Sequence, residues 1–119
     1  TNFFQFNMAE NTTNEQELKF YFADKDDEAM GIETYVYPNG NMIKRLQLST
    51  GKTAIVRELK GVDMTEVEKL TDGDTSKVFP AIIAVATKID GGFIVMEDVL
   101  QYKAKDYNRL KIAASALNF

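Results

Sequence analysis

The longest apolar segment of the chain, VFPAIIAVATKIDGG from Val78 to Gly92, constrains the fold most. The spacing of its larger apolar side chains by four, three and four residues predicts a helix with one continuous apolar face. These residues are Val78, Ile82, Val85 and Ile89. Ile83 and the alanines occupy much of the remaining circumference, so this helix should be buried on several sides. It is shorter than the about twenty residues that cross a bilayer, which indicates a soluble globular domain packed around it.

The composition limits the chemistry that is open to the chain. Its 119 residues suit one domain with its own core. It contains no cysteine and no histidine, which excludes disulfides, thiolate metal sites, cysteine nucleophiles and the commonest general base. The net charge of −4 argues against a broad phosphate-binding surface. We therefore expect no metal, no cofactor, no nucleic acid and no membrane among its ligands and partners.

Residues 1–16 combine three phenylalanines, Phe3, Phe4 and Phe6, with a polar tract. They contain no basic region followed by a long apolar run, so we expect no signal peptide and a location in the cytoplasm. Such a segment is either a loosely ordered extension or a docking segment whose phenylalanines contact a neighbouring subunit. In both interpretations residues 1–119 form a single domain with an N-terminal extension.

The middle of the chain predicts a three-stranded antiparallel β-meander. Its strands are expected at Ile32–Tyr37, Met42–Leu48 and Thr53–Leu59. Asn39-Gly40 lies between the first two runs and is typical of a tight hairpin turn. Residues 17–22 are aromatic enough for a further strand. In the third run, Ala54 and Val56 should share one face of the sheet while Ile55 and Arg57 share the other.

Helices are expected to follow the meander and cover it. Asp63 with Glu66 resembles a capping box, which predicts a helix that begins at Asp63. Pro80 suits the first position of the central helix, so that helix should begin near Phe79. A short helix should run from Glu97 to about Tyr102, and Asp106 should cap a last helix. The apolar residues expected to be buried on the first and last of these helices are Met64, Val67 and Leu70, and Leu110, Ala113, Ala114 and Leu117. The predicted fold class is α+β, a three-stranded antiparallel β-meander followed by three to four helices packing on it.

Two short sequences resemble parts of a nucleotide site. Residues 49–53, STGKT, look like the end of a phosphate-binding loop, and residues 87–90, TKID, look like the guanine-reading sequence of GTPases. A phosphate-binding loop needs a glycine five residues before Gly51, where this chain has Leu46. The residues after the loop favour a strand, so no helix N-terminus would face a phosphate. We therefore interpret the two sequences as a β-turn and the end of a helix.

Acidic residues offer two further candidate sites. Residues 24–28 lack the ligand spacing of a calcium loop and are expected to be solvated. Glu97 and Asp98 are adjacent, so on a helix they point in different directions and do not form a catalytic pair. We expect no catalytic residues and no enzymatic activity, although a nucleotide-dependent or carboxylate-dependent enzyme remains an alternative.

The order of features from Lys44 to the end resembles the tail assembly chaperones of tailed phages, in particular the family of Mu-like tail assembly proteins. The features that carry the resemblance are RELKGVD at 57–63, the Ile89-Asp90-Gly91 turn, MEDVL at 96–100, Asp106-Tyr107 and the closing residues 117–119. The resemblance implies a protein without catalytic residues that binds the long helical tape measure protein before tail-tube assembly. It also implies self-association into a homo-oligomer and a location in the cytoplasm of the bacterial host. The alternative is a structural or adaptor component of a phage tail or related injection apparatus.

A holding chaperone needs apolar surface that can pack against varied helices. The candidate partner-binding residues are Phe3, Phe4 and Phe6 in the extension, and Leu110 and Leu117 on the last helix. For Leu110 and Leu117 the alternative is a place in the core, and for the three phenylalanines it is a loosely ordered extension.

Overall fold

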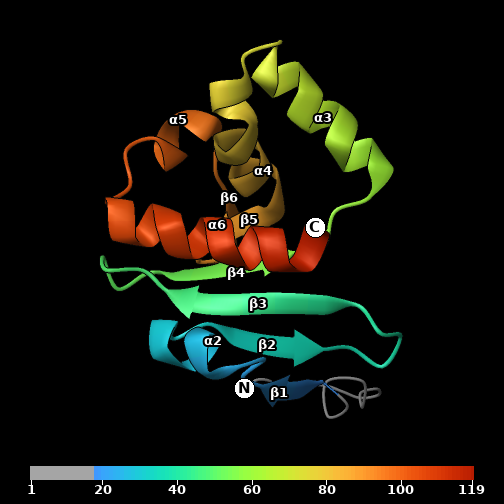
Figure 1. Ribbon diagram of the computed structural model, residues 1–119, viewed down its shortest axis with the longest axis vertical. Coiled ribbons are helices and arrows are strands. Elements are labelled where there is room, and N and C mark those ends of the chain that lie inside the picture. The colour runs from blue at the N-terminus through green and yellow to red at the C-terminus, as the bar shows by residue number, and fades with distance from the viewer. Residues whose placement is uncertain (1–17) are drawn as a thin grey trace.

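The computed structural model describes residues 18–119 as one six-stranded antiparallel sheet with helices packed on it (Figure 1). The strands pair in sequence order and are β1 (Lys19–Tyr21), β2 (Glu33–Val36), β3 (Met42–Gln47), β4 (Thr53–Arg57), β5 (Thr87–Ile89) and β6 (Gly92–Phe93). The predicted α+β class is confirmed. The predicted meander corresponds to β2, β3 and β4, and the sheet has three further strands that extend it on both sides.

The helices lie mainly on one face and at one end of this sheet. They are α2 (Lys25–Met30), α3 (Gly61–Thr71), the short 3-10 helix η1 (Thr75–Lys77), α4 (Val78–Ala86), α5 (Met96–Val99) and α6 (Ala104–Asn118). Helix α6 packs along β3 and β4, and α2 lies on the same face over β2 (Figure 1). Helix α3 packs on α4, which leads directly into β5. No helix within residues 18–119 has the length and apolar character needed to cross a membrane.

Helix α4 forms the centre of the core. Ala81, Ile82 and Ile83 are at most 1% exposed, and they belong to one apolar cluster with residues of the sheet and of α6. The helix begins at Val78, and Pro80 is its third residue rather than its first. This position tolerates proline because the first four N–H groups of a helix have no intrahelical acceptor.

The central helix ends earlier than its apolar spacing predicts. It stops at Ala86, and Thr87–Ile89 forms β5, which pairs with β4 through Val56↔Thr87 and Ala54↔Ile89. The prediction failed here because Ile89 lies four residues after Val85 and two after Thr87, so it fits both a helical and a strand period. Pairing with β4 decides between them, since it satisfies the backbone groups of these residues along the sheet.

The first turns of α3 and α6 also differ from the prediction. Asp63 and Asp106 are each the third residue of their helix, not the residue that precedes it. Asp63 accepts a hydrogen bond from the Lys60 N–H at 2.8 Å, as a carboxylate at this position can. Asp106 instead accepts hydrogen bonds from the backbone N–H and the hydroxyl of Ser49, in the β3–β4 turn. Its carboxylate therefore fixes α6 to the sheet rather than capping the helix.

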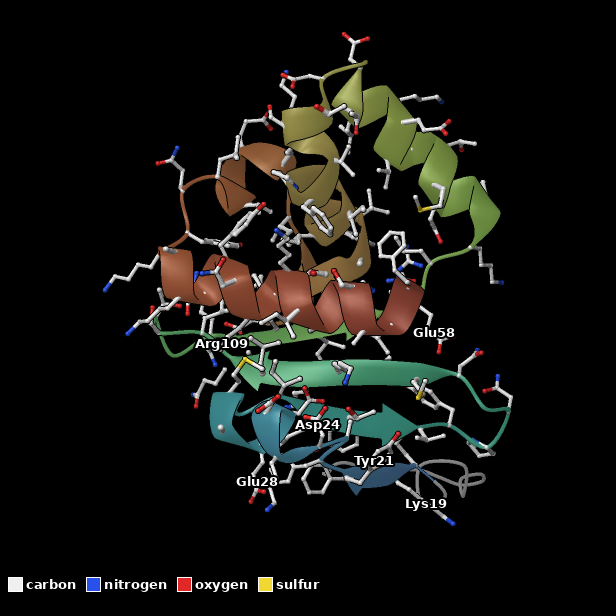
Figure 2. The ribbon with its side chains drawn as sticks, viewed as in Figure 1. Lys19, Tyr21, Asp24, Glu28, Glu58 and Arg109 are labelled. Carbon is white, nitrogen blue, oxygen red and sulfur yellow. The ribbon has the colours of Figure 1, made fainter. Side chains whose placement is uncertain are left out.

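A buried ion pair attaches α2 to the sheet. Lys44 of β3 lies on the helix-covered face, with its Nζ 2.9 Å from Asp27 Oδ2 of α2 and 2.9 Å from the Thr34 hydroxyl. The side chains of Lys44 and Asp27 are only 5% and 8% exposed. The expectation that the acidic stretch is solvated is therefore wrong at Asp27. Asp24, the residue before α2, accepts a hydrogen bond from the Asp27 N–H and caps the helix. It lies on the same face of the sheet as Arg109 of α6 (Figure 2).

Replacing Asp27 with alanine should strongly destabilise the protein, because it leaves the Lys44 ammonium buried without its counter-charge. We expect Asp27→Ala to lower the free energy of unfolding by about 3 kcal/mol in urea denaturation. The matched control is Asp26→Ala on the exposed side of the same helix, which should change it by less than about 0.5 kcal/mol. Adding Lys44→Met to Asp27→Ala should recover part of the loss. Equal effects of the two alanine variants would contradict a stabilising role for the ion pair.

Candidate functional site

The residues predicted to bind a partner do not form one surface in the described part of the chain. Phe3, Phe4 and Phe6 lie outside the described residues. Leu110 has no exposed surface and belongs to the core, and Leu117 is half-buried against that core. The apolar stripe of α6 thus faces the sheet and α4, so Leu110 is not accessible to a partner while the core is closed.

The two sequences that resemble parts of a nucleotide site lie side by side. The Thr53 N–H donates to Asp90 Oδ1 at 2.9 Å, and the Asp90 N–H donates to the Thr53 carbonyl at 2.8 Å. STGKT forms the β3–β4 turn and leads into a strand, as expected, whereas TKID forms β5 and its turn rather than a helix end. Because a strand and not a helix follows this loop, a phosphate at Lys52 would not face a helix N-terminus there.

These turns border a cleft of about 610 Å³ that extends to α5 and the start of α6. Three of its lining residues are carboxylates that already accept hydrogen bonds from backbone N–H groups. Asp90 accepts from Thr53, Asp98 from Val95 and Asp106 from Ser49. These hydrogen bonds stabilise the loops around the cleft.

Two ionisable groups at this cleft have shifted pKa values with structural causes. Burial opposes ionisation of Asp106, but hydrogen bonds from Ser49 and Arg109 outweigh it and hold the pKa of this carboxyl below its usual value. Burial, with the nearby Asp98 and Asp106, raises the pKa of Tyr102. Among residues 18–119, no three carboxylates lie close enough together to hold a metal ion.

A second hollow, which we call the apolar groove, lies between α3 and the chain after β6. It has a volume of about 380 Å³. Its buried and half-buried lining residues are all apolar: Leu70, Ala84, Val85, Ile94 and Met96. Its exposed lining residues are Arg57, Glu66, Phe93, Val95 and Glu97. Phe93 is 86% exposed and Val95 58% exposed, so the rim of the groove presents apolar side chains to solvent.

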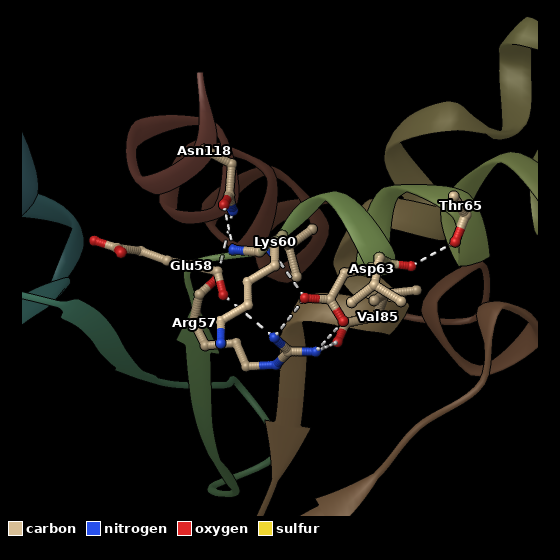
Figure 3. A network of polar contacts seen from close by, with 9 residues as sticks. Arg57, Glu58, Lys60, Asp63, Thr65, Val85 and Asn118 are labelled. Atoms are coloured by element: carbon tan, nitrogen blue, oxygen red, sulfur yellow. Dashed lines mark hydrogen bonds and ion pairs between the residues drawn. The ribbon is translucent and has the colours of Figure 1, made fainter.

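Arg57, which lines the apolar groove, is the centre of a polar junction (Figure 3). The Arg57 guanidinium donates to both carboxylate oxygens of Asp63, at 3.0 and 3.1 Å, and contacts the Val85 carbonyl at 3.4 Å. Asn118 of α6 joins the same junction by accepting from the Leu59 N–H at 2.6 Å. The junction therefore holds the end of β4, the start of α3 and the ends of α4 and α6 in fixed positions.

The opposite face of the sheet, which we call the open face, carries two cross-strand rows of side chains. One row is Phe20, Tyr35, Ile43 and Arg57. The other is Glu33, Arg45, Ile55, Lys88 and Phe93. Their side chains are exposed or half-buried, because α2, α4 and α6 pack against the other face. Arg57 and Phe93 belong both to the open face and to the apolar groove, so the two surfaces are continuous.

Comparison of this chain with protein-family models, curated proteins and solved structures finds no match.

The Arg57 junction predicts a specific acid titration. The hydrogen bond from Arg57, followed by the one from the Lys60 N–H, lowers the pKa of Asp63 from 3.8 to about 2. A carboxyl with a lowered pKa contributes stability that is present above about pH 4 and is lost as the pH falls towards 2. Arg57→Met should raise the Asp63 pKa towards 3.8 and reduce this acid-dependent loss.

The measurement is the carboxyl carbon chemical shift of Asp63 by NMR between pH 6 and pH 1.5. Arg45→Met, which breaks the other exposed arginine ion pair on the sheet, is the control and should leave the Asp63 midpoint unchanged. A midpoint near 3.8 in the unmodified protein would show that the Arg57–Asp63 contact does not persist in solution.

Proposed function

We propose that this chain is a phage tail assembly chaperone that binds the tape measure protein and keeps it soluble before the tail tube assembles. It acts in the cytoplasm of the bacterial host, without enzymatic activity, and as a homo-oligomer. The resemblance of residues 44–119 to Mu-like tail assembly proteins supports this proposal. The structural observation that carries it is the apolar groove, with its half-buried apolar lining and the exposed side chains of Phe93 and Val95.

The apolar lining and the charge of the groove fit one amphipathic helix of the client. Helix-in-groove recognition uses an apolar stripe of the bound helix against an apolar channel. The exposed carboxylates of Glu66 on α3 and Glu97 on α5 lie along the groove. They favour a helix that carries lysine or arginine beside its apolar stripe and disfavour an acidic one. We therefore assign the groove to a basic-flanked amphipathic helix of the tape measure protein.

The alternative function, a structural or adaptor component of the tail or injection apparatus, would use the same groove on a partner that stays in the finished particle. Mass spectrometry of purified particles separates the two. An assembly chaperone is released and should be absent, whereas a structural component should be present at a fixed ratio to the tube proteins.

Co-expression with the tape measure protein encoded in the same genome tests the proposal and the groove together. We expect the client to be soluble only when this chain is present. Val95→Asp should abolish that effect or lower the affinity at least tenfold, because it places a charge within the apolar groove. The control is Leu100→Asp on the C-terminal side of α5, a residue that is 55% exposed and does not line the groove.

Two outcomes would count against these assignments. A client that stays insoluble with the unmodified protein would overturn the proposed function. Binding that is equally strong in Val95→Asp and in the unmodified protein would overturn the groove as its site.

A further inference from the structure

The open face of the sheet carries a group of aromatic and β-branched side chains. The rings of Phe20 and Tyr35 lie 5.4 Å apart between centroids, and the ring of Phe22 lies 5.1 Å from that of Phe20. Ile43 and Ile55 continue this surface across β3 and β4 as half-buried side chains. An antiparallel sheet with one packed face commonly alternates apolar and polar residues, so these aromatic and β-branched residues indicate that something covers the second face.

One cation of the open face has no ion-pair partner within residues 18–119. Its cations are Arg45, Arg57 and Lys88, of which Arg45 bonds Glu33 at 3.0 Å and Arg57 bonds Asp63 at 3.0 Å. Lys88 belongs to none of the ion pairs found within residues 18–119, and its ammonium lies 4.7 Å from the centroid of the Phe93 ring. A segment that combines apolar side chains with negative charge would match this surface.

Residues 1–17 of the same chain have this composition. They contain Phe3, Phe4 and Phe6, together with three glutamates and no lysine or arginine, and so carry three of the four net negative charges of the chain. They join the sheet at β1, which is an edge strand. At about 3.3 Å per residue the segment spans up to about 56 Å, whereas six strands spaced about 4.8 Å apart extend about 24 Å. The segment is therefore long enough to cross the whole face.

We propose that residues 1–17 lie across the open face of their own chain, with the phenylalanines against Tyr35, Ile43 and Ile55 and the glutamates near Lys88. The same chain is the favoured occupant because a tether of this length keeps the segment near the face at millimolar effective concentration.

The absence of tryptophan from the chain allows a direct test in the full-length protein. Ile55→Trp places a single reporter on the open face, and Ile112→Trp places one on the exposed side of α6 as a control. Fluorescence quenching by acrylamide is measured for each with and without the combined change Phe3→Ser, Phe4→Ser and Phe6→Ser. We expect the serine change to raise the quenching constant of the Ile55→Trp protein at least twofold and to leave that of Ile112→Trp unchanged.

The remaining outcomes decide against the proposal. An unchanged quenching constant at Ile55→Trp shows that the segment does not cover the face. Protection that is lost on dilution, together with a mass above that of one chain by light scattering, assigns the cover to a second copy instead. If Ile55→Trp does not fold, as judged by circular dichroism, Thr53→Trp on the same face of β4 replaces it. Client binding is measured separately through Val95→Asp, so failure of this proposal and failure of the proposed function give different results.

Discussion

The structure depends on the burial of α4 and on its direct continuation into β5. A helix as apolar as VFPAIIAVA must be covered on nearly all sides, because each exposed apolar side chain would cost about 1.5–3 kcal/mol. Helices α3, α5 and α6 and the sheet strand β4 supply that cover. Since β5 follows α4 without a loop, the position of the helix also fixes which strand extends the meander beyond β4. One buried segment thus determines both the core and the order of the sheet.

The strands β2, β3 and β4 were predictable because each alternates between a core-facing and an outward-facing residue. Strand β1 and the apolar stripe of α3, which consists of Met64, Val67 and Leu70, also follow from the local sequence pattern. Strand β5 and helix α2 were not predictable in this way. Three residues, TKI, continue a helical spacing as well as they form a strand, and only pairing with β4 selects the strand. Helix α2 is acidic and six residues long, and it depends on an ion pair with a lysine 17 positions away.

The candidate binding surfaces likewise could not be located from the local sequence pattern. The alternation of side chains along β4 predicts that Ile55 and Arg57 lie on the same face of the sheet, and they do. It does not predict which face the helices cover. The apolar groove joins α3, the end of α4 and the chain after β6, which are separated by up to about thirty residues in sequence. No local signal in the sequence identifies Phe93 and Val95 as neighbours of Leu70. The sequence predicted apolar binding surface on the last helix, where Leu110 is buried, and gave no signal for the apolar groove.

Aspartates that accept hydrogen bonds from the backbone hold the fold together, whereas the apolar groove and the open face carry apolar side chains. Asp63, Asp90, Asp98 and Asp106 each accept a hydrogen bond from a backbone N–H at a junction between elements. Groups held in this way connect neighbouring elements of the fold. The apolar groove and the open face meet at Arg57. Because Arg57 also holds the start of α3 against α4, an occupant that displaces its guanidinium would change the width of the groove. Occupancy of one surface and affinity at the other are thus expected to be coupled through this one side chain.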